Sequence, residues 1–452
     1  SFRITTLNAM NVGTDVSLLG MPPHEDWVLK ALYQDKSFLR DDLGHKIFRD
    51  MGHYSSRSRF FEMVIDGEYR GVYQLLEKVK RDRGRVNISK MTQADVSGDD
   101  LTGGYIISLD KFVPGVDKGW HSKYKSNATG DSANFYLYIY PNPDSIMPQQ
   151  MNYIKNYVDQ FEDAMMAPDL SKSNYQRFID VPSFADNFIL TELCRNVDGY
   201  RSSTFFHKDK ASSGNGKLKA GPAWDFNIAF GNCLPNFGSD PYWWAYDQNT
   251  NVNFIPFWWK KLMSDSLFKN ELRCRYQKHR AGVLSEAHLF NYIDQMAAHL
   301  EEAQVRNYQR HPILGQVIWP GPSPAPATYA GEIGYLKWWL HERLLWMDKQ
   351  LAGTCVVTVA SNDPANIQLR SGPNPFGESF ELTYHTGDNT FVKAELLGVM
   401  GTRAMLISEG TKNEGMHQET ISTSQIPVGP YILKLTMNNE VYYQKLLKIN
   451  NN

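Results

Sequence analysis

Two aspartates stand in sequence surroundings that could support a reaction. Asp198 follows directly on a predicted helix, and Asp225 lies in the segment 224–227, Trp-Asp-Phe-Asn. Between them, residues 204–207 and 217–220 predict the two strands of a β-hairpin joined by a polar, glycine-containing turn. Because a hairpin returns to where it began, both carboxylates should lie within reach of one ligand.

Phosphoryl transfer needs carboxylates in this kind of arrangement. One carboxylate accepts the proton of the attacking hydroxyl, and a second holds Mg²⁺ against the nucleotide phosphates. Mg²⁺ binds through one or two protein oxygens plus phosphate and water, so Asp225 with Asn227 would suffice as its ligands. The alternative is that Asp198, Gly199 and Asp225 are only turn and capping residues, and their spacing leaves it open.

A charged cluster at 77–85, Glu-Lys-Val-Lys-Arg-Asp-Arg-Gly-Arg, is a second candidate. A lysine at a strand end close to Glu77 could contact nucleotide phosphates. Lys78 and Lys80 both remain candidates, because the strand register is uncertain by one residue. The alternative is a solvated loop, which is what a run of charges usually forms. Further positive charge could come from Arg40, Arg57, Arg59 and Arg81.

The elements that must position these residues fall into two parts. Residues 1–150 are rich in strand signals, with strands predicted at 60–65, 69–77 and 104–109 and an Asp66-Gly67 turn joining the first two. A helix is predicted at 37–51, with Ser37 as N-cap and Gly52 at its end. Residues 151–353 are mainly helical, with helices predicted at 151–165, 181–195, 257–262, 267–276 and 330–351.

The character of the chain changes after Gly353. Residues 354–452 alternate apolar and polar side chains in short segments, such as 380–384 and 431–435, separated by Gly, Pro and Asn. About five to seven such strands predict a β-sandwich. The predicted fold class is therefore α+β, with a mixed β-sheet N-terminal part, a mainly helical C-terminal part and a small all-β Ig-like sandwich after them.

Composition argues against several classes of protein. The 452 residues are 42% hydrophobic and 21% charged, the balance of a soluble globular protein. A formal net charge of −2 gives no reason to expect nucleic acid as a partner, and no apolar run is long enough to span a bilayer. Four scattered cysteines, none in a C-x-x-C pair, argue against a disulfide scaffold or a thiolate zinc site. The tryptophans at 258, 259, 338 and 339 are expected in the core, with carbohydrate contact as the alternative.

A linked pattern of short segments covers the body. It comprises residues 18–22, 26–29, 35–40, 51–52, 66–73, 77–82, 103–105, 196–199 and 224–232. In this order the segments resemble the CotH kinase family, named after a bacterial spore-coat protein, and the resemblance runs from residue 1 to about 350. The family resembles atypical protein kinases that phosphorylate Ser or Thr on secreted and coat proteins.

This resemblance implies roles for individual residues. Asp198 would be the catalytic base, Asp225 with Asn227 would bind Mg²⁺ or Mn²⁺, and the Glu77/Lys78 strand end would contact ATP. Many members have Asp at the position of Asn227, and Asn removes a charge, which should weaken metal binding. Members also usually carry an Arg-Gly-x-Ser-Ser-like segment upstream of the position of Ser1, so we expect a mature or trimmed chain that begins just after that segment.

The tail carries a second resemblance. Residues 373–376, 392–396, 399–401, 426–431 and 443–449 are similar to the C-terminal sorting domain of type IX secretion. This implies export across an outer membrane, the type IX machinery as a partner, a secreted or outer-membrane surface-attached location and a Bacteroidetes-like source. The alternative is an Ig-like module that only packs against the body.

Together the resemblances predict a secreted kinase that transfers phosphate from Mg-ATP to Ser or Thr of a secreted or surface protein. ATP is scarce outside cells, which favours an alternative: a CotH-like scaffold, catalytically weak or inactive, that attaches to protein or polysaccharide at the cell surface. The presence of both Asp198 and Asp225 favours catalysis. Asn227 favours the scaffold, and so does the lack, from Ser1 onward, of the glycine-containing segment that family members usually carry.

Overall fold

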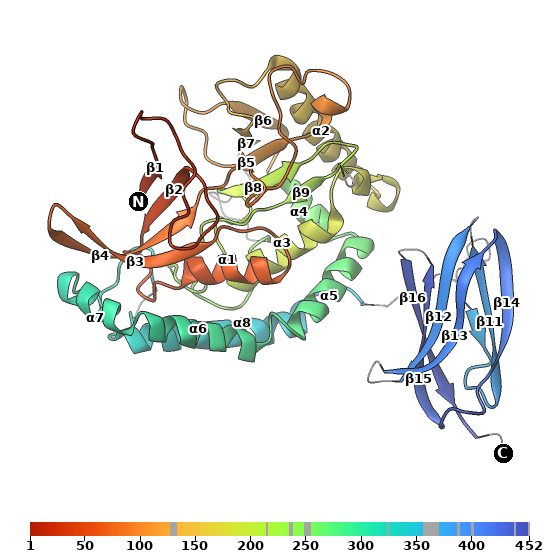
Figure 1. The fold of residues 1–452 in the computed structure, drawn as a ribbon. Helices are drawn as coiled ribbons and strands as arrows, with labels where there is room; N and C mark the ends of the chain where they lie inside the picture. The colour runs from red at the N-terminus through yellow and green to blue at the C-terminus, as the bar shows by residue number, and fades with distance from the viewer. Residues whose placement is uncertain are drawn as a thin grey trace. The chain divides into compact units, whose positions relative to one another are not determined.

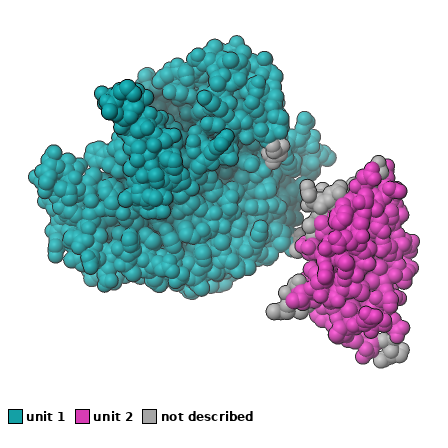
Figure 2. All heavy atoms as spheres, in the orientation of Figure 1, with its two compact units in different colours: residues 1–355 teal, residues 356–452 magenta. Residues whose placement is uncertain are grey.

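The structure is a computed structural model with two compact units, residues 1–355 and residues 356–452 (Figure 2). It describes residues 1–126, 133–213, 216–234, 238–247, 255–322, 325–355, 370–386, 389–398, 402–437 and 440–450. The first unit combines sheets and helices and the second is all β, which confirms the predicted α+β class with a β tail.

The first sheet is antiparallel, with strand order β1-β2-β4-β3. Its strands are β1 (Phe2–Thr5), β2 (Asp26–Ala31), β3 (Ser58–Ile65) and β4 (Glu68–Glu77). The predicted Asp66-Gly67 turn joins β3 to β4, and both residues have positive φ, of 52° and 79°, as a tight hairpin turn requires.

Helix α1 (Arg40–Asp50) lies beside this sheet (Figure 1). It begins three residues later than predicted, and Ser37 is not its N-cap. Asp35 instead satisfies a backbone group at the N-terminus of the helix, because its carboxylate accepts a hydrogen bond from the N–H of Arg40 at 2.8 Å. Asp41 and Asp42 occupy the first turn, where the helix dipole favours negative charge.

The second sheet has strand order β6-β7-β5-β8-β9. It consists of β5 (Tyr105–Leu109), β6 (Gly119–Lys125), β7 (Ala133–Tyr140), β8 (Thr204–Lys208) and β9 (Leu218–Ala220). Strands β8 and β9 are antiparallel neighbours, with Phe206 opposite Ala220, so the predicted hairpin is confirmed. Asp198 precedes this hairpin and Asp225 follows it.

Helices make up the remainder of the first unit. They are α2 (Pro148–Met165), α3 (Val181–Cys194), α4 (Phe257–Leu262), α5 (Ser266–Arg280), α6 (Glu286–His299), α7 (Glu301–Arg310) and α8 (Tyr329–Gln350), with short 3₁₀ turns at Asp99–Thr102, Leu170–Lys172 and Tyr175–Arg177. Helix α3 is buried over almost its whole length, whereas α6, α7 and α8 lie along the lower edge of the unit in Figure 1. The sequence patterns predicted all of these α-helices except α6 and α7.

Three of the four tryptophans expected in the core are there. Trp258, Trp259 and Trp339 are almost completely buried. Trp338 is 49% exposed, so the prediction for it is wrong. Its ring packs at a tilt against that of Tyr335 on the outer side of α8, at a position that the helical repeat turns away from the core.

A disulfide bond joins Cys274 of α5 to Cys355. The segment before Cys355 also lies against α5, where the backbone N–H of Thr354 donates to Oδ1 of Asn270 at 2.9 Å. Arg273 donates to the carbonyl of Leu351 at 3.2 Å. These contacts fasten the end of the first unit to one helix.

The second unit is a β-sandwich of two sheets, ordered β10-β11-β14 and β13-β12-β15-β16. The strands are β10 (Arg370–Gly372), β11 (Ser379–Thr386), β12 (Thr390–Gly398), β13 (Arg403–Lys412), β14 (Gly415–Ser422), β15 (Gly429–Met437) and β16 (Glu440–Lys448). Its core includes Leu382 and Tyr384 of one sheet and Leu433 and Leu435 of the other, as their alternation predicted. The matched segment 399–401 lies outside the described residues. Within the described residues, no helix is long and apolar enough to cross a membrane.

Candidate active site

Lys30 of β2 is the centre of a three-residue ion cluster. Its Nζ donates to Oδ1 of Asp41 in α1 at 2.7 Å and to Oδ1 of Asp225 at 2.8 Å. Strand β2 runs through the middle of its sheet, and Lys30 pairs with Gln74 of β4 in the register. The cluster therefore joins the sheet, the first turn of α1 and the segment after β9.

The charges of this cluster support one another. Burial alone would lower the pKa of Lys30, but the attraction of Asp41 and Asp225 outweighs it and raises that pKa. Burial alone would raise the pKa of Asp41, but Lys30 and a hydrogen bond from the backbone of Phe226 lower it. Lys30 is therefore a cation and Asp41 an anion at neutral pH, with the Lys30 side chain 12% exposed and that of Asp41 1% exposed.

Helix α1 also holds Phe226, the residue directly after Asp225. Oδ1 of Asp41 accepts the N–H of Phe226 at 2.8 Å. The Phe226 ring packs against Gly44, where an added Cβ would lie 2.3 Å from a ring carbon. Glycine is thus required at this turn of the helix, because any side chain would displace the segment that carries Asp225.

His45 completes the support beneath the cluster. Its ring is fully buried, lies edge-on to Trp224 and Phe226, and its Nδ1 pairs with Oγ of Ser55 at 2.7 Å. Ser55 in turn donates to the carbonyl of Ala223 at 3.2 Å. Burial lowers the pKa of His45 to about 3, so the ring is neutral.

Asp225 is presented in an unusual backbone conformation. Its φ is +64°, in the left-handed region that Asp tolerates better than most residues, and its side chain is 39% exposed. Lys30 uses Oδ1, so Oδ2 is the carboxylate oxygen that could bind a cation. Strained conformations of this kind concentrate at functional sites.

Asn227 stands two residues further along, with its amide nitrogen occupied. Its Nδ2 donates to Oε1 of Gln34 at 2.9 Å. Asn232 fixes the backbone of the same loop by donating to the carbonyls of Gln34 and Asn227, at 2.9 and 2.6 Å. These bonds orient the Asn227 amide so that its oxygen is the atom left to act as a ligand.

The turn that carries Asp198 is tied to Asp225. Helix α3 ends at Cys194, and Arg195 takes the left-handed conformation, with φ of 44°, that turns the chain out of the helix. Nδ2 of Asn196 then donates to the backbone carbonyl of Asp225 at 2.9 Å. The carboxylate of Asp198 forms an ion pair with Arg201 at 2.7 Å. The structure therefore brings Asp198, Asp225 and Asn227 into one neighbourhood.

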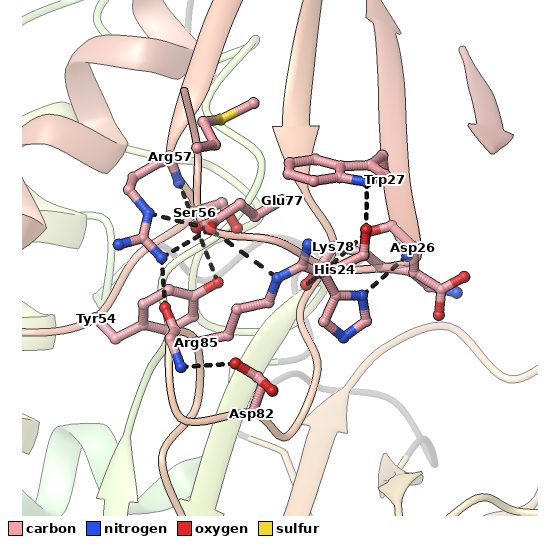
Figure 3. A network of polar contacts seen from close by, with 12 residues as sticks. His24, Asp26, Trp27, Tyr54, Ser56, Arg57, Glu77, Lys78, Asp82 and Arg85 are labelled. Atoms are coloured by element: carbon pink, nitrogen blue, oxygen red, sulfur yellow. Dashed lines mark hydrogen bonds and ion pairs between the residues drawn. The ribbon is translucent and has the colours of Figure 1, made fainter. Parts of the chain in front are cut away.

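Glu77 lies in a different polar network, at the end of β4 (Figure 3). Its buried carboxylate accepts hydrogen bonds from Nε and Nη2 of Arg57, at 3.0 and 2.7 Å, and from the backbone N–H of Arg57 at 3.0 Å.

Arg85 stacks over the Trp27 ring and donates to the carbonyls of Asp26 and Lys78, each at 2.9 Å. This network fastens the strand end to β2 and to the turn at 81–86.

The other basic residues predicted from the sequence have partners of their own. Lys80 pairs with Asp26 at 2.8 Å, Arg59 donates to the carbonyl of Ser58 at 2.8 Å, and Arg81 donates to that of Ile88 at 3.0 Å. Burial, and then the nearby charge of Lys80, lower the pKa of Lys78. None of the contacts described for these residues reaches Asp225.

Lys30 was missed by the sequence analysis. It reads as an ordinary polar position in the strand Asp-Trp-Val-Leu-Lys-Ala, and its partners are 11 and 195 residues away. The available signal was a lysine within a strand followed by a helix with acidic residues in its first turn. In protein kinases a strand lysine paired with a helix carboxylate contacts the nucleotide phosphates, and an aspartate after the hairpin binds Mg²⁺.

The donor set fits a hard cation. The oxygens of Asp225 and Asn227 are ligands that Mg²⁺ accepts together with phosphate and water. Within the described ranges, no group of three or more His, Cys, Asp or Glu side chains is placed to hold a metal ion. A zinc-type site is therefore not found there, whereas magnesium needs fewer protein ligands.

Comparison with known families matches both units. The family described as CotH kinase protein matches residues 1–347, and the secretion system C-terminal sorting domain matches residues 373–449. A search of curated proteins found no match. The second match marks the chain for export to the cell exterior or surface by type IX secretion. With more than three quarters of its length matched by one family model, this chain belongs to the family described as CotH kinase protein and carries a type IX sorting domain.

Proposed function

We propose that this chain transfers the terminal phosphate of Mg-ATP to a Ser or Thr hydroxyl of a secreted or surface protein. The observation that supports this most strongly is the Lys30 cluster, with Nζ 2.7 Å from Asp41 and 2.8 Å from Asp225. If the cluster served only to stabilise the fold, we would expect all of its side chains to be buried away from solvent. Here Asp225 is 39% exposed, and its backbone carbonyl accepts a hydrogen bond from Asn196, in the turn that carries a second carboxylate, Asp198.

In this proposal each residue has one task. Lys30 binds the phosphates and Asp41 orients its ammonium group. Asp225 and Asn227 hold Mg²⁺, which neutralises phosphate charge during transfer. Asp198 accepts the proton of the acceptor hydroxyl. Because Asn227 is neutral, the site should bind Mg²⁺ more weakly than a site with two carboxylates.

The nucleotide contacts predicted for Glu77, Lys78, Lys80, Arg59 and Arg81 stay predictions. The Arg57–Glu77 network gives Glu77 a structural task that is sufficient to explain its burial. Contact of Lys78 or Lys80 with bound nucleotide would add to the role of Lys30.

Calorimetric titration of the chain with ATP and Mg²⁺ or Mn²⁺ tests the nucleotide site. Lys30→Met is expected to weaken binding at least about tenfold, because a charge-assisted contact to phosphate is lost (~1.5–3 kcal/mol). Lys118→Met, which removes a surface lysine paired with Asp144 outside the cluster, is the matched control and should bind like the wild type. Equal binding by wild type and Lys30→Met would contradict the assignment.

The alternative of a catalytically weak scaffold is favoured by one observation. Arg201 pairs with the carboxylate of Asp198 at 2.7 Å, and a base must be free to accept a proton. A scaffold would bind protein or polysaccharide at the cell surface without consuming ATP. Binding of Mg-ATP without phosphate transfer to any protein would support the scaffold.

A further inference from the structure

The segment 239–246, downstream of Asp225, is held by its backbone at almost every residue. Nε1 of Trp339 donates to the carbonyl of Ser239 at 2.9 Å, and Arg195 donates to the carbonyl of Asp240. Nη1 of Arg343 donates to the carbonyls of Pro241 and Trp243, at 2.9 and 2.7 Å. We call these residues the clamped segment.

A buried ion pair completes the clamp. Arg343 of α8 and Glu192 of α3 pair at 3.0 Å, and both side chains are 0% exposed. Glu192 accepts the N–H groups of Ala245 and Tyr246, at 2.8 and 2.9 Å. Placing two charges in the interior costs free energy that a hydrophobic pair would not. Here the pair fixes the shape of an irregular surface segment.

The clamped segment displays one large side chain. Trp243 is 67% exposed, and its φ is +70°. A bulky residue rarely takes this left-handed conformation, because it strains the backbone. Leaving an indole in water also forgoes the stabilisation that its burial would bring. Rigid, exposed tryptophans of this kind are what protein interfaces use as anchors.

The clamped segment lies beside the turn that carries Asp198. An added Cβ on Gly238 would lie 2.8 Å from Cγ1 of Val197 and 3.5 Å from the carbonyl of Arg195. The hydrogen bond from Arg195 to Asp240 joins the same two stretches of chain. Trp243 is therefore attached, through a few rigid residues, to the side of the site where an acceptor hydroxyl would meet Asp198.

Two polar groups of Tyr242, the residue before Trp243, are engaged within the protein. The Tyr242 hydroxyl donates to Glu342 at 3.1 Å, and Oδ1 of Asp240 accepts the N–H of Tyr242 at 2.7 Å. A sugar platform needs hydrogen-bonding groups turned toward the ligand. With both groups of Tyr242 engaged, the exposed indole suits an apolar side chain.

We propose that Trp243 is a docking residue for the acceptor, and that it binds an apolar side chain of the polypeptide that carries the acceptor hydroxyl. This rests on the proposed kinase function. Arg343 and Glu192 act as positioning residues, since they hold the segment and do not contact the acceptor.

The test uses the full chain, Mg-ATP and a peptide library with one fixed Ser and degenerate flanking positions. The wild type should select apolar residues at one flanking position. Trp243→Asn should lose this selection and raise KM for the selected peptide at least about tenfold, with unchanged calorimetric affinity for Mg-ATP. Asn is chosen because it tolerates the left-handed conformation. Trp243→Phe should keep most of the selection.

Trp319→Asn is the matched control, because this indole is 70% exposed and lies outside the clamped segment. Unaltered selection in Trp243→Asn, or the same loss in Trp319→Asn, would overturn the docking role alone. Absence of any phosphorylated peptide with the wild type would overturn the docking role and the proposed function together.

Discussion

At the scale of single residues, the candidate site depends on how one lysine is shared. Lys30 neutralises the almost fully buried Asp41 and at the same time holds one oxygen of the exposed Asp225. Bound phosphates would compete for the ammonium group, and Asp41 would keep it in place. The neutral His45 and the tight contact of Phe226 with Gly44 keep the surrounding backbone fixed while this happens.

A second buried carboxylate makes stability depend on pH. Glu162 of α2 accepts hydroxyl hydrogen bonds from Ser122 and Tyr136, at 2.7 and 2.8 Å, and burial raises its pKa from 4.5 to about 7. Between these values the folded chain holds a proton that the unfolded chain has lost, so stability falls as pH rises. A shift of this size corresponds to roughly 3 kcal/mol as an upper bound.

Thermal unfolding at about pH 5 and about pH 7.5 checks this dependence. The melting temperature of Glu162→Gln should fall less between these two pH values than that of the wild type, because the titrating group is gone. Glu301→Gln, which changes an exposed glutamate of α7, should behave like the wild type. The same loss in Glu162→Gln as in the wild type would show that Glu162 does not titrate as described.

The sequence selected Asp198, Asp225 and Asn227 as candidates, but neither Lys30 nor Asp41, which form the buried ion pair of the candidate site. Asp198, Asp225 and Asn227 stand at turns next to a recognisable hairpin, so residue type and local pattern were enough to select them. The sequence signal for Lys30, a strand lysine ahead of a helix with acidic residues in its first turn, is weak, because its importance comes from residues that only the tertiary fold brings near. The charged run at 77–85 stood out more in the sequence, yet Arg85 is 3% exposed and serves to join strand ends.

At the scale of elements, prediction succeeded where the apolar repeat was strong. Helices α2, α3, α5 and α8 carry buried stripes and were found, although α1 begins later because Asp35 provides the N-terminal contacts. Helices α6 and α7 were missed because each buries only two residues along its length. A surface helix with so small an apolar face resembles a polar loop in sequence.

The disulfide between α5 and Cys355 makes an element-scale prediction. It closes a loop over a sequence separation of 81 residues, so Cys274→Ser with Cys355→Ser should lower unfolding stability by about 2–4 kcal/mol. Calorimetric melting measures the effect. A reducing agent should lower the melting temperature of the wild type and leave that of the double variant unchanged. Equal melting temperatures of wild type and variant without reductant would contradict this.

At the scale of the whole molecule, each unit has its own hydrophobic core. The first unit is organised around α3 and its aromatic neighbours, and the second around facing side chains of two sheets. The change from a helical to a two-residue repeat after Gly353 made the fold class readable from the sequence. The disulfide, which no local pattern predicted, suits the oxidising surroundings that an exported protein meets.

The central claim is that this exported CotH protein transfers phosphate, and phosphate transfer itself tests it most directly. The measurement is incorporation of the labelled terminal phosphate of Mg-ATP into Ser- or Thr-containing peptides by the wild type, Asp198→Asn and Asp225→Asn. We predict incorporation by the wild type and a loss of at least about a hundredfold in both variants, with Mg-ATP binding kept in Asp198→Asn. Incorporation that is absent from the wild type, or equal in all three, would contradict the account.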